Sequence, residues 1–153
     1  MSTFLSDPST KNTSLICRQA HTGPIPTSLL KIFEVGGRIF LSLLFLISGL
    51  IKISVYDVTL DYMALSGVPG VLLPLAIATE VLGAIAIMVG WQTRFVALLL
   101  AGYSILTALL FHLDFGDAIE TVMFLKNVSI AGGLLLLVAN GAGPLSLDQR
   151  AGR

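Results

Sequence analysis

Four stretches of nearly continuous apolar residues dominate the chain, with short polar segments between them. They lie at roughly 33–53, 71–90, 93–112 and 121–139. Each is about 20 residues long, the length at which an α-helix crosses a bilayer core of about 30 Å. None alternates apolar with polar residues as the strands of a membrane β-barrel do. Because backbone amides in lipid must be paired within the segment, the pattern predicts an all-α protein, a four-helix transmembrane bundle.

The first outer loop, residues 54–70, has a helical pattern of its own. Apolar residues recur along one face of it: Val55, Val58, Tyr62 and Leu65. Asp57 and Asp61 share another face, and Gly67 supplies a C-terminal stop. This pattern predicts a short interfacial helix that lies at the membrane surface.

Lysine and arginine are unevenly distributed over the connecting segments. One set of segments carries Lys11, Arg18, Lys31, Arg94, Arg150 and Arg153. The other set is mainly acidic, with Asp57, Asp61, Asp114, Asp117 and Glu120, and with Lys52 at its edge. By the positive-inside rule, this asymmetry predicts that both termini are cytoplasmic.

Residues 1–30 differ from the rest of the chain. They are rich in Ser, Thr and Pro and carry no helical periodicity, so we expect a mobile cytoplasmic N-terminal tail. The transmembrane domain is expected to occupy residues 31–150. The first apolar run is too long for a signal-peptide core and no cleavage site follows it, so the first span should stay attached.

Composition agrees with a membrane protein and excludes several functions. Hydrophobic residues make up 55% of the chain and charged residues 12%, whereas a soluble domain carries about a quarter charged residues. The nine basic and nine acidic residues cancel, so no basic surface is available for a nucleic acid. The lipid bilayer is the expected partner.

Cofactor motifs are missing from the sequence. The single cysteine, Cys17, excludes an internal disulfide and any multi-cysteine zinc or iron–sulfur site. A bis-histidine haem needs two histidines facing each other across the bundle. It is not expected, because the only histidine besides His112 is His21, which lies in the predicted tail. The lone Gly141-Ala142-Gly143 has no Rossmann context and gives no support for NAD binding. We therefore expect no metal, haem or NAD.

Ionisable residues interrupt all four predicted spans: Arg38, Lys52, Glu80, His112 and Lys126. A charge at mid-bilayer costs about 2.5–3.5 kcal/mol on insertion scales, so each needs a partner or a role. Helix rise, counted from the cytoplasmic ends, puts Glu80 about 15 Å deep and Lys126 about 20 Å deep. These two residues are therefore predicted to form an ion pair. Lys52 and His112 are each expected about 28 Å deep, and Arg38 about 8 Å.

Two interpretations of these residues remain open. The ion pair can serve only to fix helix register. Alternatively, the residues line a polar cavity, whose candidate ligand-binding residues are Glu80, Lys126, Asn127, Lys52, His112 and Arg38. An excess of cations over carboxylates in such a cavity favours an anionic or easily reduced ligand.

Helical spacing assigns two faces to the bundle interior. In the first span the face contains Arg38, Ser42, Phe45, Gly49 and Lys52. In the third span it contains Arg94, Leu98, Ala101, Ile105, Ala108 and His112.

Short motifs follow one another in a definite order along residues 33–150. They are Arg38, Ser48-Gly49, Lys52, Gly67-Val68-Pro69-Gly70, Leu73-Pro74, Glu80, Gly90, Thr93-Arg94, Leu110-Phe111-His112, Phe124-Leu125-Lys126-Asn127, Ala131-Gly132-Gly133, Gly141, Gly143 and Ser146-Leu147-Asp148. This order resembles the DoxX family of small bacterial membrane proteins. The GVPG loop and the Phe-x-Lys-Asn segment are most similar to the branch found in the proteobacterial inner membrane.

The resemblance implies a bacterial inner-membrane location and a link to redox enzymes. The family takes its name from proteins linked to a membrane thiosulfate:quinone oxidoreductase, and its members are often labelled oxidoreductases. It therefore implies a redox-associated subunit that uses a diffusible quinone or a redox-enzyme partner. In that case His112, Lys52 and Lys126 would hydrogen-bond quinone carbonyls, and Glu80 would move a proton.

Two other functions stay open beside the redox role. One is a small-metabolite transporter or permeability factor, and the other is a non-catalytic membrane assembly protein. Whether the chain is itself an enzyme, and its oligomeric state, are left undecided by the sequence.

The charge asymmetry makes a direct prediction about topology. Reporter fusions after residues 66, 92, 117 and 153 should read outside, inside, outside and inside, because basic segments are retained in the cytoplasm. Paired alkaline phosphatase and fluorescent-protein fusions measure this. A periplasmic reading at residue 153 would refute the assignment.

Overall fold

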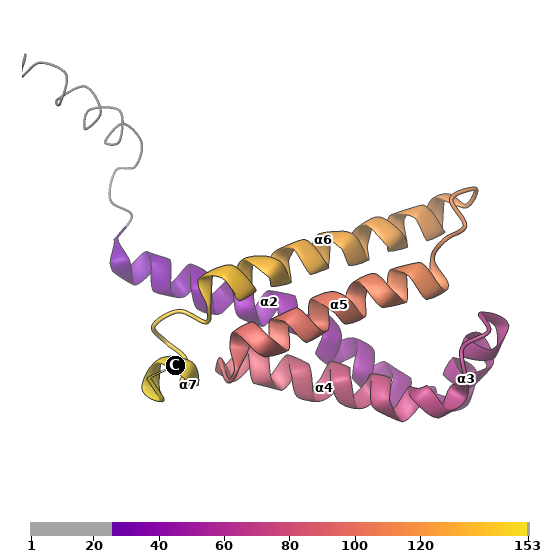
Figure 1. Cartoon of the computed structure of the whole chain (residues 1–153), viewed down its shortest axis with the longest axis horizontal. Helices are drawn as coiled ribbons and strands as arrows, with labels where there is room; N and C mark the ends of the chain where they lie inside the picture. The colour runs from indigo at the N-terminus through magenta and orange to yellow at the C-terminus, as the bar shows by residue number, and fades with distance from the viewer. Residues whose placement is uncertain (1–25, 153) are drawn as a thin grey trace, which may run out of the picture. The chain divides into compact units, whose positions relative to one another are not determined.

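The structure is a computed structural model that describes residues 26–152, and it is all-helical there (Figure 1). In chain order the elements are α2 (Thr27–Ser54), α3 (Tyr56–Leu65), the 3₁₀ turn η1 (Gly70–Leu72), α4 (Leu73–Val89), α5 (Thr93–Phe111), α6 (Ala118–Asn140) and α7 (Leu147–Arg150). The all-α prediction is confirmed. Most of the predicted tail, residues 1–25 of 1–30, lies outside the described residues, and α2 already begins at Thr27.

The long helices coincide with the four apolar stretches. Among the described residues, three segments are long and apolar enough to cross a membrane, namely Gly70–Val89, Thr93–Phe111 and Ala118–Asn140. The fourth candidate is α2 together with α3, two helices that meet at a bend of 100°. These lengths and compositions are those of a transmembrane helical bundle.

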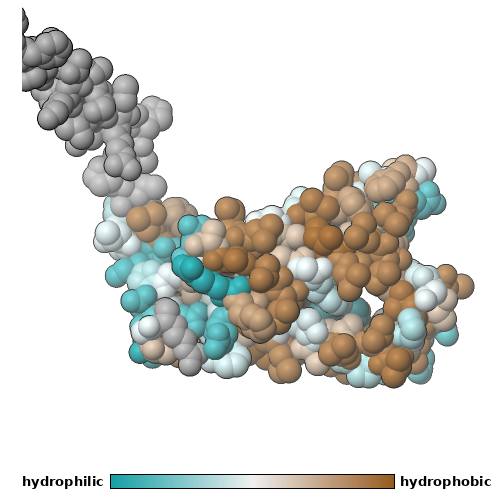
Figure 2. Space-filling model, in the orientation of Figure 1, coloured by the Kyte–Doolittle hydropathy of each residue, from teal (hydrophilic) through white to brown (hydrophobic). Residues whose placement is uncertain are grey.

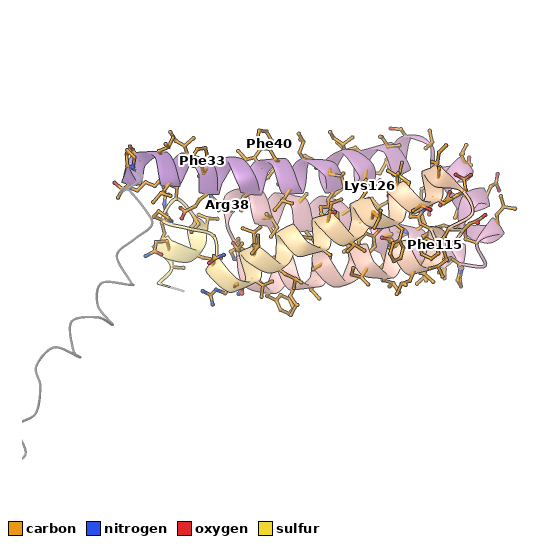
Figure 3. All side chains as sticks on the ribbon, turned by 90° about the horizontal axis from the view of Figure 1, so that it is seen from above. Phe33, Arg38, Phe40, Phe115 and Lys126 are labelled. Atoms are coloured by element: carbon orange, nitrogen blue, oxygen red, sulfur yellow. The ribbon has the colours of Figure 1, made fainter. Side chains whose placement is uncertain are left out.

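Within the compact unit Lys31–Arg153, α5 lies between α4 and α6, and α2 packs alongside them (Figures 1 and 3). The two-sided packing of α5 explains its content of small buried residues, since small side chains let membrane helices approach closely. The outer face of α2 is apolar and exposed. Phe33 and Phe40 on that face point away from the other helices (Figure 3).

The buried face of α2 is the predicted one, because Arg38, Ser42, Phe45 and Gly49 are all buried. The predicted face of α5 is partly wrong. Its buried residues are Thr93, Ala97, Leu100, Ala101, Ser104 and Ala108. Leu98 and Ile105 are instead exposed. The prediction was anchored on two charged residues at the helix ends, whereas the packing follows the small residues in the middle of the helix.

The predicted helix of the first outer loop is present as α3. Met63 is buried against Val68 and Leu73, whereas Val58 and Leu65 are 67% and 89% exposed. An apolar row that is exposed on a short helix beside a transmembrane bundle is what insertion into the membrane surface requires.

The C-terminal segment closes one end of the bundle. Arg38 is buried and its Nη2 donates to the carbonyl of Leu145 at 2.6 Å. The carboxylate of Asp148 accepts hydrogen bonds from the amides of Gln92 and Thr93 at 2.7 and 2.8 Å. Asp148 therefore caps α5, whose N-cap position is Gln92.

Gly90 makes the turn between α4 and α5 possible. Its φ is +72°, a region that favours glycine, and a Cβ at this position would collide with the Arg38 guanidinium and with Ser146. The turn thus depends on both the conformational freedom and the small size of glycine.

We predict that Gly90→Ala destabilises the protein by at least about 1–3 kcal/mol, the cost of a left-handed non-glycine residue. Unfolding in one detergent, followed by circular dichroism, measures this loss. The matched control is Gly102→Ala in α5, where no atom lies within 4 Å of the added methyl group. Equal stability of the two variants would contradict the prediction.

Candidate functional site

A cavity of about 450 Å³ lies among α2, α3, α4, α5 and α6. Its lining is mainly apolar, with a small number of polar side chains. Five of the six predicted site residues line it: Lys52, Glu80, His112, Lys126 and Asn127. Figure 2 shows the surface hollowed near one end of the bundle, between α3 and the ends of α5 and α6.

A hydrogen-bonded network surrounds Glu80 at the inner wall of the cavity. Lys52 Nζ lies 2.8 and 2.9 Å from the two Glu80 carboxylate oxygens and 2.7 Å from Ser48 Oγ. The Tyr103 hydroxyl donates to Glu80 Oε1 at 2.7 Å. The Glu80 side chain is only 5% exposed. Its charge is therefore compensated by an ammonium group and by a phenol in a low-dielectric setting.

The predicted ion pair between Glu80 and Lys126 is wrong, because Glu80 pairs with Lys52. The depth calculation placed α2 too deep, because it put Lys52 about 28 Å from the starting end of the spans. Arg38 lies beside Gly90 at the end of α4, so Lys52 is about 21 Å above that level and Glu80 about 15 Å. The lysine side chain spans the difference.

A close approach of two helices brings the pair together. A Cβ added to Gly49 of α2 would lie 2.7 Å from Val81 Cγ2 and 3.3 Å from Glu80 Cβ. Lys52 follows Gly49 by one turn, so its side chain starts next to Glu80. The nearest packing partner of α6 is α5, which leaves Lys126 on another wall of the cavity.

A second polar contact lies at the end of the cavity nearest the loop between α5 and α6. His112 ends α5, and its Nδ1 lies 2.6 Å from Glu120 Oε2 in the first turn of α6. The two side chains are 18% and 32% exposed. This contact joins the ends of α5 and α6 across their short loop.

Lys126 and Asn127 supply the remaining polar groups, on the α6 wall. The only contact recorded for Lys126 Nζ among the described residues is with Met123 Sδ at 3.1 Å, and Lys126 lies partway along α6 (Figure 3). No side-chain hydrogen bond is formed by Asn127 within the part of the chain that is described. Both side chains therefore keep donors that can serve a molecule in the cavity.

Arg38, the sixth candidate, does not line this cavity. It lies in the end network with Leu145 and Gly90. The expectation that Arg38 belongs to the polar cavity is therefore wrong. Arg38 is buried and binds the C-terminal segment through the carbonyl of Leu145.

Three polar partners were not identified from the sequence: Tyr103, Ser48 and Glu120. Tyr103 and Ser48 are uncharged, so a search for intramembrane charges passes over them. The spacing of Ser48 could have identified it as a partner of Lys52, because Ser48 precedes Lys52 by one helical turn and accepts a hydrogen bond from it. Glu120 was counted only as a loop charge for orientation.

The observed pairs change the charge balance of the cavity. Glu80 compensates Lys52, and Glu120 faces His112. In residues 26–152 no group of three His, Cys, Asp or Glu side chains is arranged to hold a metal ion. Among the lining residues, Lys126 is therefore the cation that has no carboxylate partner, and the excess of cations that favoured an anionic ligand is smaller than expected.

The ion pair predicts strong coupling between Lys52 and Glu80. Lys52→Met should destabilise by about 3–5 kcal/mol, since it leaves the buried Glu80 carboxylate unpaired, and Glu80→Gln by less, since Lys52 is 25% exposed. The double variant should recover much of the larger loss. A double-mutant cycle in detergent measures the coupling, expected above about 1 kcal/mol.

The matched control is the cycle of Glu80→Gln with Lys126→Met, which should show coupling below about 0.5 kcal/mol. Stronger coupling at Lys126 than at Lys52 would contradict the observed pairing.

Comparison with known proteins places the chain in a family. The DoxX family model matches residues 34–113. The inner membrane protein YqjF of Escherichia coli K12 is 44% identical over 122 residues, which cover 78% of this chain and 94% of YqjF. The inner membrane protein YphA of the same organism is 42% identical over 120 residues, 74% of this chain and 86% of YphA. No solved structure matches the chain. The family match and these two relatives show that the chain is a DoxX-family inner-membrane protein.

Proposed function

We propose that the cavity binds a quinone-type amphiphile and that the protein acts as a redox-associated subunit of the inner membrane. The observation that carries the proposal is an apolar cavity with compensated charges and a few unused hydrogen-bond donors. Its volume of about 450 Å³ falls in the usual range for small-molecule sites, about 300–1,000 Å³.

Charge compensation favours a neutral head group over an anionic one. Lys52 is held by Glu80, and its three N–H donors are accounted for by Ser48 Oγ and the two carboxylate oxygens. Lys52 therefore acts on the ligand only as part of the neutral inner wall. This revises the expectation that Lys52 hydrogen-bonds a quinone carbonyl.

The unused donors lie on the α6 wall, where Lys126 and Asn127 face the cavity. Carbonyl oxygens are acceptors, and a quinone ring carries two of them at opposite ends. We propose that Lys126 and Asn127 bind one of these oxygens. The apolar lining, which includes Leu110 and Phe111, accommodates the ring and the start of its tail.

The hollow near the end of the bundle that carries α3 supports entry from the membrane beside the exposed apolar residues of α3 (Figure 2). A transmembrane helical protein presents its sides to lipid. Quinones are dissolved in that phase, so an opening beside exposed apolar residues suits them better than it suits a water-soluble anion. We place the ligand-binding unit in residues 31–150, with both termini in the cytoplasm.

We predict that the purified protein in nanodiscs binds a short-tailed ubiquinone analogue. Lys126→Met should weaken this binding about tenfold or more, because a charge-assisted hydrogen bond contributes about 1.5–3 kcal/mol. Native mass spectrometry and isothermal titration measure the binding.

Ser129→Ala is the matched control on the same helix, because Ser129 Oγ donates only to its own helix carbonyl at Leu125 and does not line the cavity. Its affinity should equal that of the unmodified protein. If the quinone analogue does not bind and an organic anion crosses proteoliposomes, the protein is a transporter. If neither occurs and the chain is retained with a partner complex, it is an assembly protein.

A further inference from the structure

The two nitrogens of His112 have different surroundings. Nδ1 lies 2.6 Å from Glu120 Oε2, whereas Nε2 has no partner among the described residues. The imidazole lines the cavity. The second ring nitrogen, Nε2, is therefore available to a molecule in the cavity.

The Glu120 carboxylate determines which nitrogen carries the proton. An ionised carboxylate can only accept hydrogen bonds, so at a distance of 2.6 Å the donor must be Nδ1–H. A neutral imidazole has one N–H and one lone pair. When Nδ1 carries the proton, Nε2 is an acceptor, as in other sites where a second partner fixes the tautomer.

The neighbouring α6 wall of the cavity has the reverse character. Lys126 offers only donors, and the Asn127 amide offers both a donor and an acceptor. A ligand that bridges the two walls thus meets an acceptor at His112 and donors at α6. A hydroxyl group, which is both donor and acceptor, satisfies both, whereas a carbonyl at His112 would face another acceptor.

We infer that His112, oriented by Glu120, makes the cavity select the reduced hydroquinone form of its ligand over the oxidised quinone. This inference deepens the proposed function and rests on it. His112 is the residue that determines redox-form specificity, and Glu120 is a positioning residue that acts through it. The reduced ring donates one hydroxyl to Nε2 and accepts at its other oxygen from Lys126 or Asn127.

The tautomer can be tested without any ligand. The chain has two histidines, His21 and His112, so a His21→Asn variant labelled with ¹⁵N-histidine reports His112 alone. At pH 8.5, nitrogen NMR should show a protonated Nδ1 and an unprotonated Nε2. Glu120→Gln should mix the two tautomers, because an amide both donates and accepts. A protonated Nε2 in the unmodified site would overturn the inference.

The selectivity is tested with one quinone analogue in its two redox states. Titration into nanodiscs at pH 8.5, with dithionite added for the reduced state, should give about five- to tenfold tighter binding of the hydroquinone, the effect of about one hydrogen bond. Glu120→Gln should lower this preference to about twofold or less. Glu34→Gln, the same change near Gly143 at the other end of the bundle, should leave it intact.

The outcomes separate this inference from the proposed function. Equal binding of both redox forms, or a preference that survives Glu120→Gln, would overturn the role of His112 and leave quinone binding standing. Failure of both forms to bind would overturn the proposed function and this inference with it, whatever tautomer the NMR spectra show.

Discussion

The ion pair between Lys52 and Glu80 is the interaction on which the rest of the structure depends. An unpaired charge inside a bilayer is costly, so each of these residues holds the other in place. Their contact fixes the register of α2 against α4. The contact also joins α2, which meets α3 at a bend, to the hairpin of α4 and α5. It therefore holds in place the helices that line the cavity.

The same pair explains why the cavity contains charges and yet suits a neutral molecule. Glu80 is surrounded by donors from Lys52 and Tyr103, and its negative charge is not available to a ligand. Because these two charges compensate each other, the inner wall of the cavity carries no net charge. The groups that remain for recognition lie at its edge, on α6 and at the end of α5.

The sequence was sufficient for those features that depend on local pattern. Continuous apolar runs located α2, α4, α5 and α6, and helical spacing identified the buried face of α2. Features that depend on how far one helix is displaced along another were not predicted. Depths counted from the ends of apolar runs assume that all spans begin at one level, and Arg38 beside Gly90 shows that they do not. The wrong partner for Glu80 follows directly from that assumption.

The cap that Asp148 supplies to α5 means that one end of the bundle is completed by residues late in the chain. Membrane helices are synthesised in order. The amides of Gln92 and Thr93 at the start of α5 bind a carboxylate that is synthesised 56 and 55 residues later, respectively. The acceptor of Arg38, the carbonyl of Leu145, is synthesised 107 residues after the arginine. A chain that ends before Leu145 thus leaves the Arg38 guanidinium without this acceptor and the first turn of α5 without its cap. The segment 145–148 therefore completes this end of the bundle only after α2, α4, α5 and α6 have been synthesised.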